Sequence, residues 1–176
     1  MTDVDDNEYP REQEMTKLLM KTTNVLELNR LAHDPIFATV VAHEILRRNG
    51  YHPSFATGYL FKPDAPGILV PYAWVETSPP LSERVDITDL TPFPDKSKHI
   101  FILGYALKIG ETSQKCSYYK KCPEDMKIQE EGVPTASAIQ KTLKNVEQYI
   151  AQRTRSNPVV RQIYDNIMEN AVLETK

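Results

Sequence analysis

The position of its prolines most restricts how this chain of 176 residues can fold. Eight of the thirteen prolines lie between Pro53 and Pro94. A proline inside an α-helix costs about 3 kcal/mol, because it removes a backbone hydrogen bond and its ring clashes with the preceding turn. The stretch therefore predicts short strands at Ser54–Phe61, Ile68–Thr77 and Arg84–Thr88, and a further strand is predicted after it at His99–Leu107. Because Pro71 lies within the second of these strands, we expect that strand at a sheet edge or at a bulge.

Helical patterns precede the proline-rich stretch. Apolar residues recur at helical spacing from Glu12 to Ala32. A second helix is predicted to begin after Asp34, a good N-cap, with Pro35 in its first turn and Gly50 as the left-handed residue beyond its end. Residues 36–42 are apolar nearly all round. This helix is therefore expected to be central and covered by other elements.

Two helices are predicted to follow the strands. Residues 110–134 have no regular period and are expected to form a long loop. Asn157 and Pro158 are an N-cap followed by a first-turn proline, which predicts the start of the last helix. The segment Val133–Leu173 is therefore predicted to be a helical hairpin. The helix before Asn157 is marked by a single apolar stripe, at Ile139, Leu143, Val146 and Ile150.

These patterns together predict one α+β domain. Residues 1–9 are expected to be an acidic flexible tail, and residues 10–176 the domain itself. A chain of this length with 40% hydrophobic residues can bury about two-thirds of the surface that it exposes when unfolded. The expected architecture is a central buried helix packed on a small, mainly antiparallel sheet, with further helices at both ends.

Charge and cysteine content narrow the class of protein. The chain carries 21 basic and 24 acidic side chains, a net charge of −3, so it lacks the basic excess typical of nucleic-acid binders. No apolar run approaches the roughly 18 residues that a membrane span needs. The first residues lack the basic and apolar regions of a secretory signal. Cys116 and Cys122 are therefore expected to stay reduced in a cytoplasmic protein that binds neither nucleic acid nor membrane.

The usual cofactor and metal motifs are missing from the sequence. The six glycines form neither of the common phosphate-binding loops. Five residues separate Cys116 from Cys122, whereas a structural zinc site usually has two to four residues between its first two ligands. The four histidines form no pair with helical metal-ligand spacing. We expect no cofactor and no metal.

Three short strings occur in a suggestive order. A helix ending in Leu46-Arg47-Arg48-Asn49-Gly50 is followed by Tyr72-Ala73-Trp74-Val75-Glu76 and then by Val85-Asp86-Ile87-Thr88. This order resembles the core of the transglutaminase-like (papain-like) cysteine enzymes. In that family the helix carries the nucleophilic cysteine near its start, a strand of form H-A-W-V-E supplies the histidine, and a strand of form V-D-x-T supplies the orienting aspartate. The resemblance implies a transglutaminase-like core over residues 34–108.

The chain departs from this family at two of the three catalytic positions. By the family's spacing the nucleophile position falls at Pro35, and the histidine position is occupied by Tyr72. Only Asp86 matches. Without a thiol no covalent intermediate can form, and a phenol that titrates near 10 is a poor base at neutral pH. The resemblance therefore implies a degenerate enzyme with no catalytic residues.

The leading functional hypothesis is a non-catalytic domain that binds a protein or peptide partner. In the resembled family the groove between the helix start and the strands accepts an extended peptide. Pro35 and aromatic residues would make this groove apolar here. The alternative to ligand binding is that Trp74 and Asp86 only support the fold. The predicted ligand-binding residues are Phe37, Tyr72, Trp74 and Asp86.

Two further hypotheses remain open. The chain could be a cysteine-type hydrolase or acyltransferase with a rearranged site, in which Cys116 or Cys122 enters the groove. Asp86 and Tyr72 could instead act there with His33 or His52 in acid–base work. Alternatively, it could be a structural subunit that docks on a larger assembly through its C-terminal helices, whose apolar stripe has heptad-like spacing. The sequence leaves the oligomeric state and the partner's identity undecided.

Overall fold

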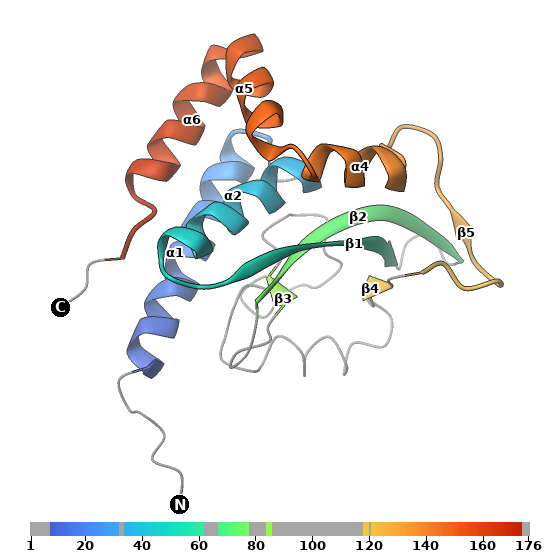
Figure 1. Ribbon diagram of the computed structural model, residues 1–176, viewed down its shortest axis with the longest axis horizontal. Coiled ribbons are helices and arrows are strands. Elements are labelled where there is room, and N and C mark those ends of the chain that lie inside the picture. The colour runs from blue at the N-terminus through green and yellow to red at the C-terminus, as the bar shows by residue number, and fades with distance from the viewer. Residues whose placement is uncertain are drawn as a thin grey trace, which may run out of the picture.

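A computed structural model of the chain describes residues 8–31, 34–61, 67–77, 84–85, 118–119 and 121–173. This part of the chain has the predicted α+β architecture (Figure 1). Its helices are α1 (Glu8–Leu28), α2 (Pro35–Arg48), α4 (Ala136–Leu143), α5 (Val146–Ser156) and α6 (Pro158–Glu169). Its strands are β1 (Pro53–Phe61), β2 (Ile68–Thr77), β3 (Arg84–Val85), β4 (Tyr118–Tyr119) and β5 (Lys127–Ile128).

The sheet is built on β1 and β2. These strands pair antiparallel along their whole length, from Pro53 opposite Thr77 to Phe61 opposite Leu69. The strand order is β3-β2-β1-β4, and β5 adds to β2 in parallel. All other pairings are antiparallel, which confirms the prediction of a mainly antiparallel sheet for the described residues.

β2 as a whole is not the edge strand expected from Pro71, although Pro71 itself pairs only with β1 among the described residues. β2 is an interior strand of the described sheet, and Pro71 lies opposite Tyr59 in a ladder with no bulge. The side of β2 that faces away from β1 pairs with β5 at Ile68 and Leu69 and with β3 at Val75 and Glu76. Pro71 lies between these two short pairings, so neither of them needs the N–H that proline lacks.

α2 begins and ends as predicted. The Oδ1 atom of Asp34 accepts hydrogen bonds from the backbone N–H groups of Ile36 and Phe37, at 3.1 and 3.2 Å. Gly50 has a φ of +85°, and its N–H donates to the carbonyl of Arg47. The N–H of Tyr51 donates to the carbonyl of Leu46, which completes a Schellman motif.

α2 is also central, as expected from its apolar character. Val40 packs on Ala73 of β2 and on the first C-terminal helix, α4. Phe37, Val41 and Ile45 belong to a separate cluster that joins α2 to α1 and α6. Figure 1 accordingly shows α2 between the sheet and the outer helices. The helix is therefore covered on several sides.

The end of α1 repeats this Schellman motif with a less suitable residue. Arg30 has a φ of +58°, and the N–H of Leu31 donates to the carbonyl of Leu26. A side chain in the left-handed region costs about 1–2 kcal/mol, more than the roughly 0.5–1 kcal/mol of chain entropy that glycine loses on folding. We therefore expect Arg30→Gly to raise the free energy of unfolding by about 0.5 kcal/mol. Gly50→Ala should lower it by about 1 kcal/mol, and urea denaturation of both variants checks the contrast.

Two predictions for the C-terminal half are wrong. The expected loop at residues 110–134 contains β4 and β5. Strands of two residues are too short to leave a period in the sequence. The expected hairpin Val133–Leu173 contains three helices, because the stripe Ile139–Ile150 breaks at Asn145, whose side chain caps α5. The stripe runs through the break because α4 and α5 both contribute to the same cluster with α2.

α1 begins at Glu8 instead of Glu12 and ends at Leu28. The last two residues of the expected tail are therefore helical.

Several predictions fall partly or wholly outside the described residues. Only Arg84 and Val85 of the strand Arg84–Thr88 are described, and the predicted strand His99–Leu107 is not. Asp86, His33 and Cys116 also lie outside the described residues.

Candidate functional site

The predicted ligand-binding aromatics of β2 lie on the sheet face that is turned away from α2. Successive side chains of a strand point to opposite faces. Ala73 contacts Val40 and accepts a 3.1 Å hydrogen bond at its carbonyl from the hydroxyl of Thr39, so odd-numbered positions of β2 face α2. Tyr72 and Trp74 instead cluster with Ala56 and Leu60 of β1, and both are almost completely buried.

Phe37 lies in the other layer. Its ring is completely buried in the cluster of α1, α2 and α6, where it meets the Tyr164 ring edge-on at a centroid distance of 6.3 Å. The Arg153 guanidinium lies 5.5 Å from the centre of the Phe37 ring. The structure therefore brings Tyr72 and Trp74 together and separates both from Phe37 by the thickness of the sheet.

The position predicted for a nucleophile is the N-terminal end of α2, where Pro35 is the first helical residue. The Asp34 carboxylate lies in front of this helix and makes two interactions. Its Oδ1 caps the helix, and its Oδ2 accepts a hydrogen bond of 3.0 Å from Nη2 of Arg153 on α5. The Nε of Arg153 is buried and has no hydrogen-bond partner among the described residues. The positive end of the helix dipole is therefore met by an internal ion pair.

Two partly buried tyrosines that pack on the cluster of α1, α2 and α6 are poor bases at neutral pH. Burial, and then the negative charge of Asp34, raise the pKa of Tyr149 well above its ordinary value, although Arg153 acts in the opposite direction. Burial, and then the negative charge of Glu44, likewise raise the pKa of Tyr164. Both phenols are therefore neutral at physiological pH and can donate hydrogen bonds.

Substitution of Asp34 separates its two roles. Asp34→Asn keeps an N-cap oxygen but removes the charge opposite Arg153, and should lower the free energy of unfolding by about 0.5–1 kcal/mol. Asp34→Ala removes both interactions and should cost about 2 kcal/mol. Urea denaturation of the two variants measures the difference. Equal losses would mean that the cap contributes nothing.

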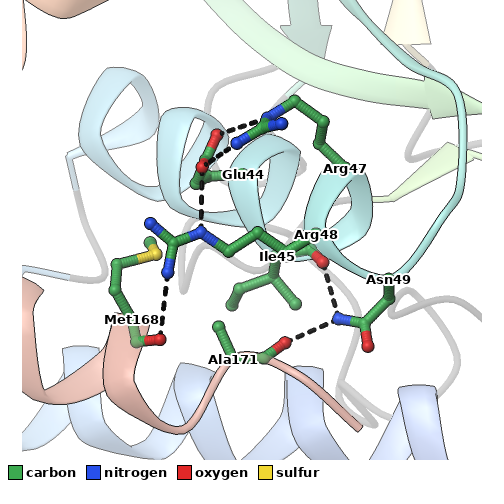
Figure 2. A network of polar contacts seen from close by, with 7 residues as sticks. All are labelled: Glu44, Ile45, Arg47, Arg48, Asn49, Met168 and Ala171. Atoms are coloured by element: carbon green, nitrogen blue, oxygen red, sulfur yellow. Dashed lines mark hydrogen bonds and ion pairs between the residues drawn. The ribbon is translucent and has the colours of Figure 1, made fainter. Parts of the chain in front are cut away.

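The C-terminal end of α2 carries a second polar network (Figure 2). Asn49 is only 5% exposed, and its Nδ2 donates to the carbonyls of Ile45 and Ala171 at 2.7 and 2.6 Å. Its Oδ1 accepts from the backbone N–H of Leu173 at 2.8 Å. The side chain therefore ties the segment after α6 to the end of α2, across more than 120 residues of sequence.

Charged residues reinforce this junction. Glu44 accepts two hydrogen bonds from Arg47 and one from Nε of Arg48, and the bond to Arg47 is the main reason why the pKa of Glu44 is lowered. In Figure 2, Arg48 extends from Glu44 to the Met168 carbonyl, to which Nη1 donates at 3.1 Å. The end of α6 is therefore held to α2 by main-chain acceptors.

His43 connects α2 with the first strand. Its ring stacks on Phe55 with a centroid distance of 4.1 Å and an interplanar angle of 14°. Burial lowers the pKa of His43 below its ordinary value of 6.5, and Arg47 acts in the same direction. Glu44 and a hydrogen bond to the backbone of Pro53 oppose this change.

The lowered pKa of His43 predicts a pH-dependent stability. The unfolded chain binds the proton more tightly than the folded chain, so the free energy of unfolding should fall as the pH drops below about 6.5. Denaturation midpoints between about pH 7.5 and about pH 5.5 measure this slope. His43→Phe keeps a stacked ring without a titrating group, and should flatten the part of the slope that His43 contributes. An unchanged slope in this variant would contradict the assignment.

The remaining predicted residues are dispersed. His52 is exposed ahead of β1, on a different element from His43. The Sγ of Cys122 lies 3.5 Å from the carbonyl oxygens of Pro123 and Met126. In the part of the chain that the structure describes, no group of three or more His, Cys, Asp or Glu side chains could hold a metal ion. Among the described helices, none is long and apolar enough to cross a membrane.

The apolar stripe of the C-terminal helices is used within the chain. Val160, Ile167 and Met168 of α6 are buried against α1 and α2, and Ile139 and Leu143 of α4 are buried against α2 and β2. The outer face of α6 is polar and carries an open concavity of about 590 Å³. It is lined by Pro158, Arg161, Gln162, Asp165, Asn166 and Glu169.

Sequence reasoning missed Arg153 and Asn49, the two residues that hold the ends of α2. Each contacts a residue about 120 positions away, a separation that no local pattern reports.

Comparison with protein-family models, curated proteins and solved structures found no match to this chain.

Proposed function

We propose that this chain is a non-catalytic, transglutaminase-like domain that binds a protein or peptide partner. The observation that carries the proposal is the internal ion pair in front of α2. A cysteine nucleophile at a helix start depends on the helix dipole and a nearby cation to stabilise its thiolate. Here Asp34 takes up the dipole and Arg153 is paired with Asp34. Pro35, which supplies no nucleophilic atom, begins the helix.

The arrangement of Tyr72 also supports a non-catalytic role. A general base must lie within about 3 Å of the proton that it removes. Tyr72 is completely buried and lies on the face of the sheet opposite to α2, so its phenol cannot reach the start of that helix. The phenols that do lie near α2 have raised pKa values. These phenols are therefore poor candidates for the base of a rearranged acid–base site at this position.

Support for the binding part of the proposal comes from Asn49. This side chain is buried and contacts the main chain of residues 171 and 173 through both its amide nitrogen and its amide oxygen. Main-chain recognition of this kind is how many modules hold extended peptides.

The non-catalytic part can be tested with purified full-length protein. We expect no hydrolysis of a panel of fluorogenic ester and amide substrates above the buffer rate. Cys116→Ala and Cys122→Ala variants are the controls. Turnover by the wild-type chain that is lost in either variant would overturn the proposal in favour of a cysteine enzyme.

The binding part needs a separate experiment. A phage library of random peptides should enrich specific sequences on the immobilised full-length chain and not on the same chain after thermal unfolding. If no sequence is enriched on the folded chain, the chain does not bind peptides, and this part of the proposal fails.

A further inference from the structure

The end of α2 contains a chemically labile pair of residues. Asn49-Gly50 is the one place in the sequence where glycine follows an asparagine. The amide carbon of an asparagine side chain can be attacked by the backbone nitrogen of the next residue. Glycine permits this attack best, because it has no side chain to obstruct the nitrogen and the most flexible backbone. By its sequence, the pair is therefore the position at which this chain loses a side-chain amide most readily.

The fold uses both members of this pair. Gly50 has a φ of +85°, which favours glycine, and its N–H closes the end of α2 on the carbonyl of Arg47. Asn49 carries both a donor and an acceptor, with which it binds the carbonyl of Ala171 and the N–H of Leu173. The labile pair is therefore a consequence of how α2 ends.

Three features of the folded chain oppose the attack. The attacking nitrogen must lose its proton, but the N–H of Gly50 is bonded to the Arg47 carbonyl at 3.1 Å. The five-membered ring that forms needs this nitrogen on the same side of the Asn49 Cα–C bond as Cβ, and a ψ of 14° turns it away. The Asn49 amide is buried and held by three hydrogen bonds, two of which are drawn in Figure 2. Folding therefore protects a bond that the unfolded chain leaves open to attack.

We propose that Asn49-Gly50 is a deamidation site that the fold protects, and that its reaction in an unfolded chain prevents later folding. The Gly50 nitrogen loses its proton to water and forms a bond to Cγ of Asn49, while the bond from Cγ to Nδ2 breaks and ammonia leaves. Water then opens the resulting succinimide at either carbonyl, which leaves aspartate or isoaspartate at position 49. No atom is oxidised or reduced, and water is the co-reactant. The inference is independent of the proposed function.

Both products are incompatible with the junction at the end of α2. A carboxylate has no donor for the carbonyls of Ile45 and Ala171, and its charge would lie against both oxygens at a buried position. Isoaspartate also adds a methylene group to the main chain. The N–H groups of Gly50 and Tyr51 would then lose their register with α2. A chain that has reacted therefore lacks the bonds that close this junction.

The first test compares native full-length protein with the same protein unfolded in guanidinium chloride, at one mildly alkaline pH. Peptide mapping by mass spectrometry follows the conversion of Asn49, which should be at least tenfold faster in the unfolded chain. Equal rates would overturn the proposal. Asn29, which is exposed and followed by Arg30, is the internal control. An equal acceleration at Asn29 would show that the protection does not come from this junction.

Gly50→Ala is the matched variant for the chemistry. Its methyl group obstructs the attacking nitrogen, so conversion of Asn49 in the unfolded variant should be at least tenfold slower than in the unfolded wild type. This comparison needs no folded variant, so it holds even if Gly50→Ala does not fold. Equal conversion of the two unfolded chains would overturn the assignment of Gly50 as the attacking residue.

The second test is refolding by dilution. Wild-type protein unfolded only briefly should refold fully, whereas protein kept in denaturant should regain its native circular dichroism only in the fraction that retains Asn49. Asn49→Asp carries one product directly and should denature at a lower guanidinium concentration than Asn49→Ala. Refolding of the converted chains, or an Asn49→Asp variant as stable as the wild type, would overturn the claim that the reaction prevents folding.

Discussion

Phe37→Ala is expected to lower the free energy of unfolding by about 4 kcal/mol. The Phe37 ring is completely buried between Tyr164 and Arg153, so its removal leaves a cavity and ends both ring contacts. Urea denaturation followed by circular dichroism measures the change. This experiment also distinguishes a core-packing role of Phe37 from the ligand-binding role predicted from the sequence. A residue that lines an open groove would contribute little to stability.

Two variants bracket the Phe37 result. Phe37→Leu keeps most of the volume and should cost about 1.5 kcal/mol. Val159→Ala removes an apolar side chain that is 60% exposed, and should change stability by less than about 0.5 kcal/mol. If Phe37→Ala behaves like Val159→Ala, the buried packing of Phe37 is refuted and the groove predicted from the sequence regains support.

Asn49→Ala should lower the free energy of unfolding by about 3 kcal/mol. The substitution removes a buried amide and leaves the carbonyl of Ala171 and the N–H of Leu173 without this partner. Each such loss of a buried hydrogen bond costs about 1–3 kcal/mol. Thermal and urea denaturation both report the effect.

α1 offers a matched control for Asn49. Asn29 follows the end of α1 as Asn49 follows the end of α2, and its Nδ2 donates to the carbonyl of Val25, four residues earlier. Asn49 makes the same local bond to Ile45. Asn29 is exposed, so Asn29→Ala should cost less than about 0.5 kcal/mol. Similar losses in the two variants would show that the bonds from Asn49 to the C-terminal segment contribute nothing.

The elements that were predictable from the sequence are those whose signals are local. Asp34, Pro35 and Gly50 specify the ends of α2 through bonds to residues no more than four positions away. The prolines and the glycine on either side of residues 68–77 likewise predicted the bounds of β2. The left-handed conformation of Arg30 was not predictable, because arginine has no preference for positive φ.

The candidate site depends on information that is not local. A period of two predicts that Tyr72 and Trp74 share one face of β2, but it does not say which face α2 covers. Nor does a helical stripe report a break at Asn145, since α4 and α5 continue the same spacing. The partners of Asp34 and Asn49 are fixed only when α5 and α6 pack on α2.

Fastening α2 at both ends by the last helices has a consequence for biosynthesis. Chains are made from the N-terminus at about 5–20 residues per second, and contacts between distant residues form late. α2 emerges from the ribosome more than one hundred residues before Arg153 and Ala171, so its apolar surface waits several seconds for its permanent cover. A nascent chain halted before α5 should therefore be a substrate for chaperones.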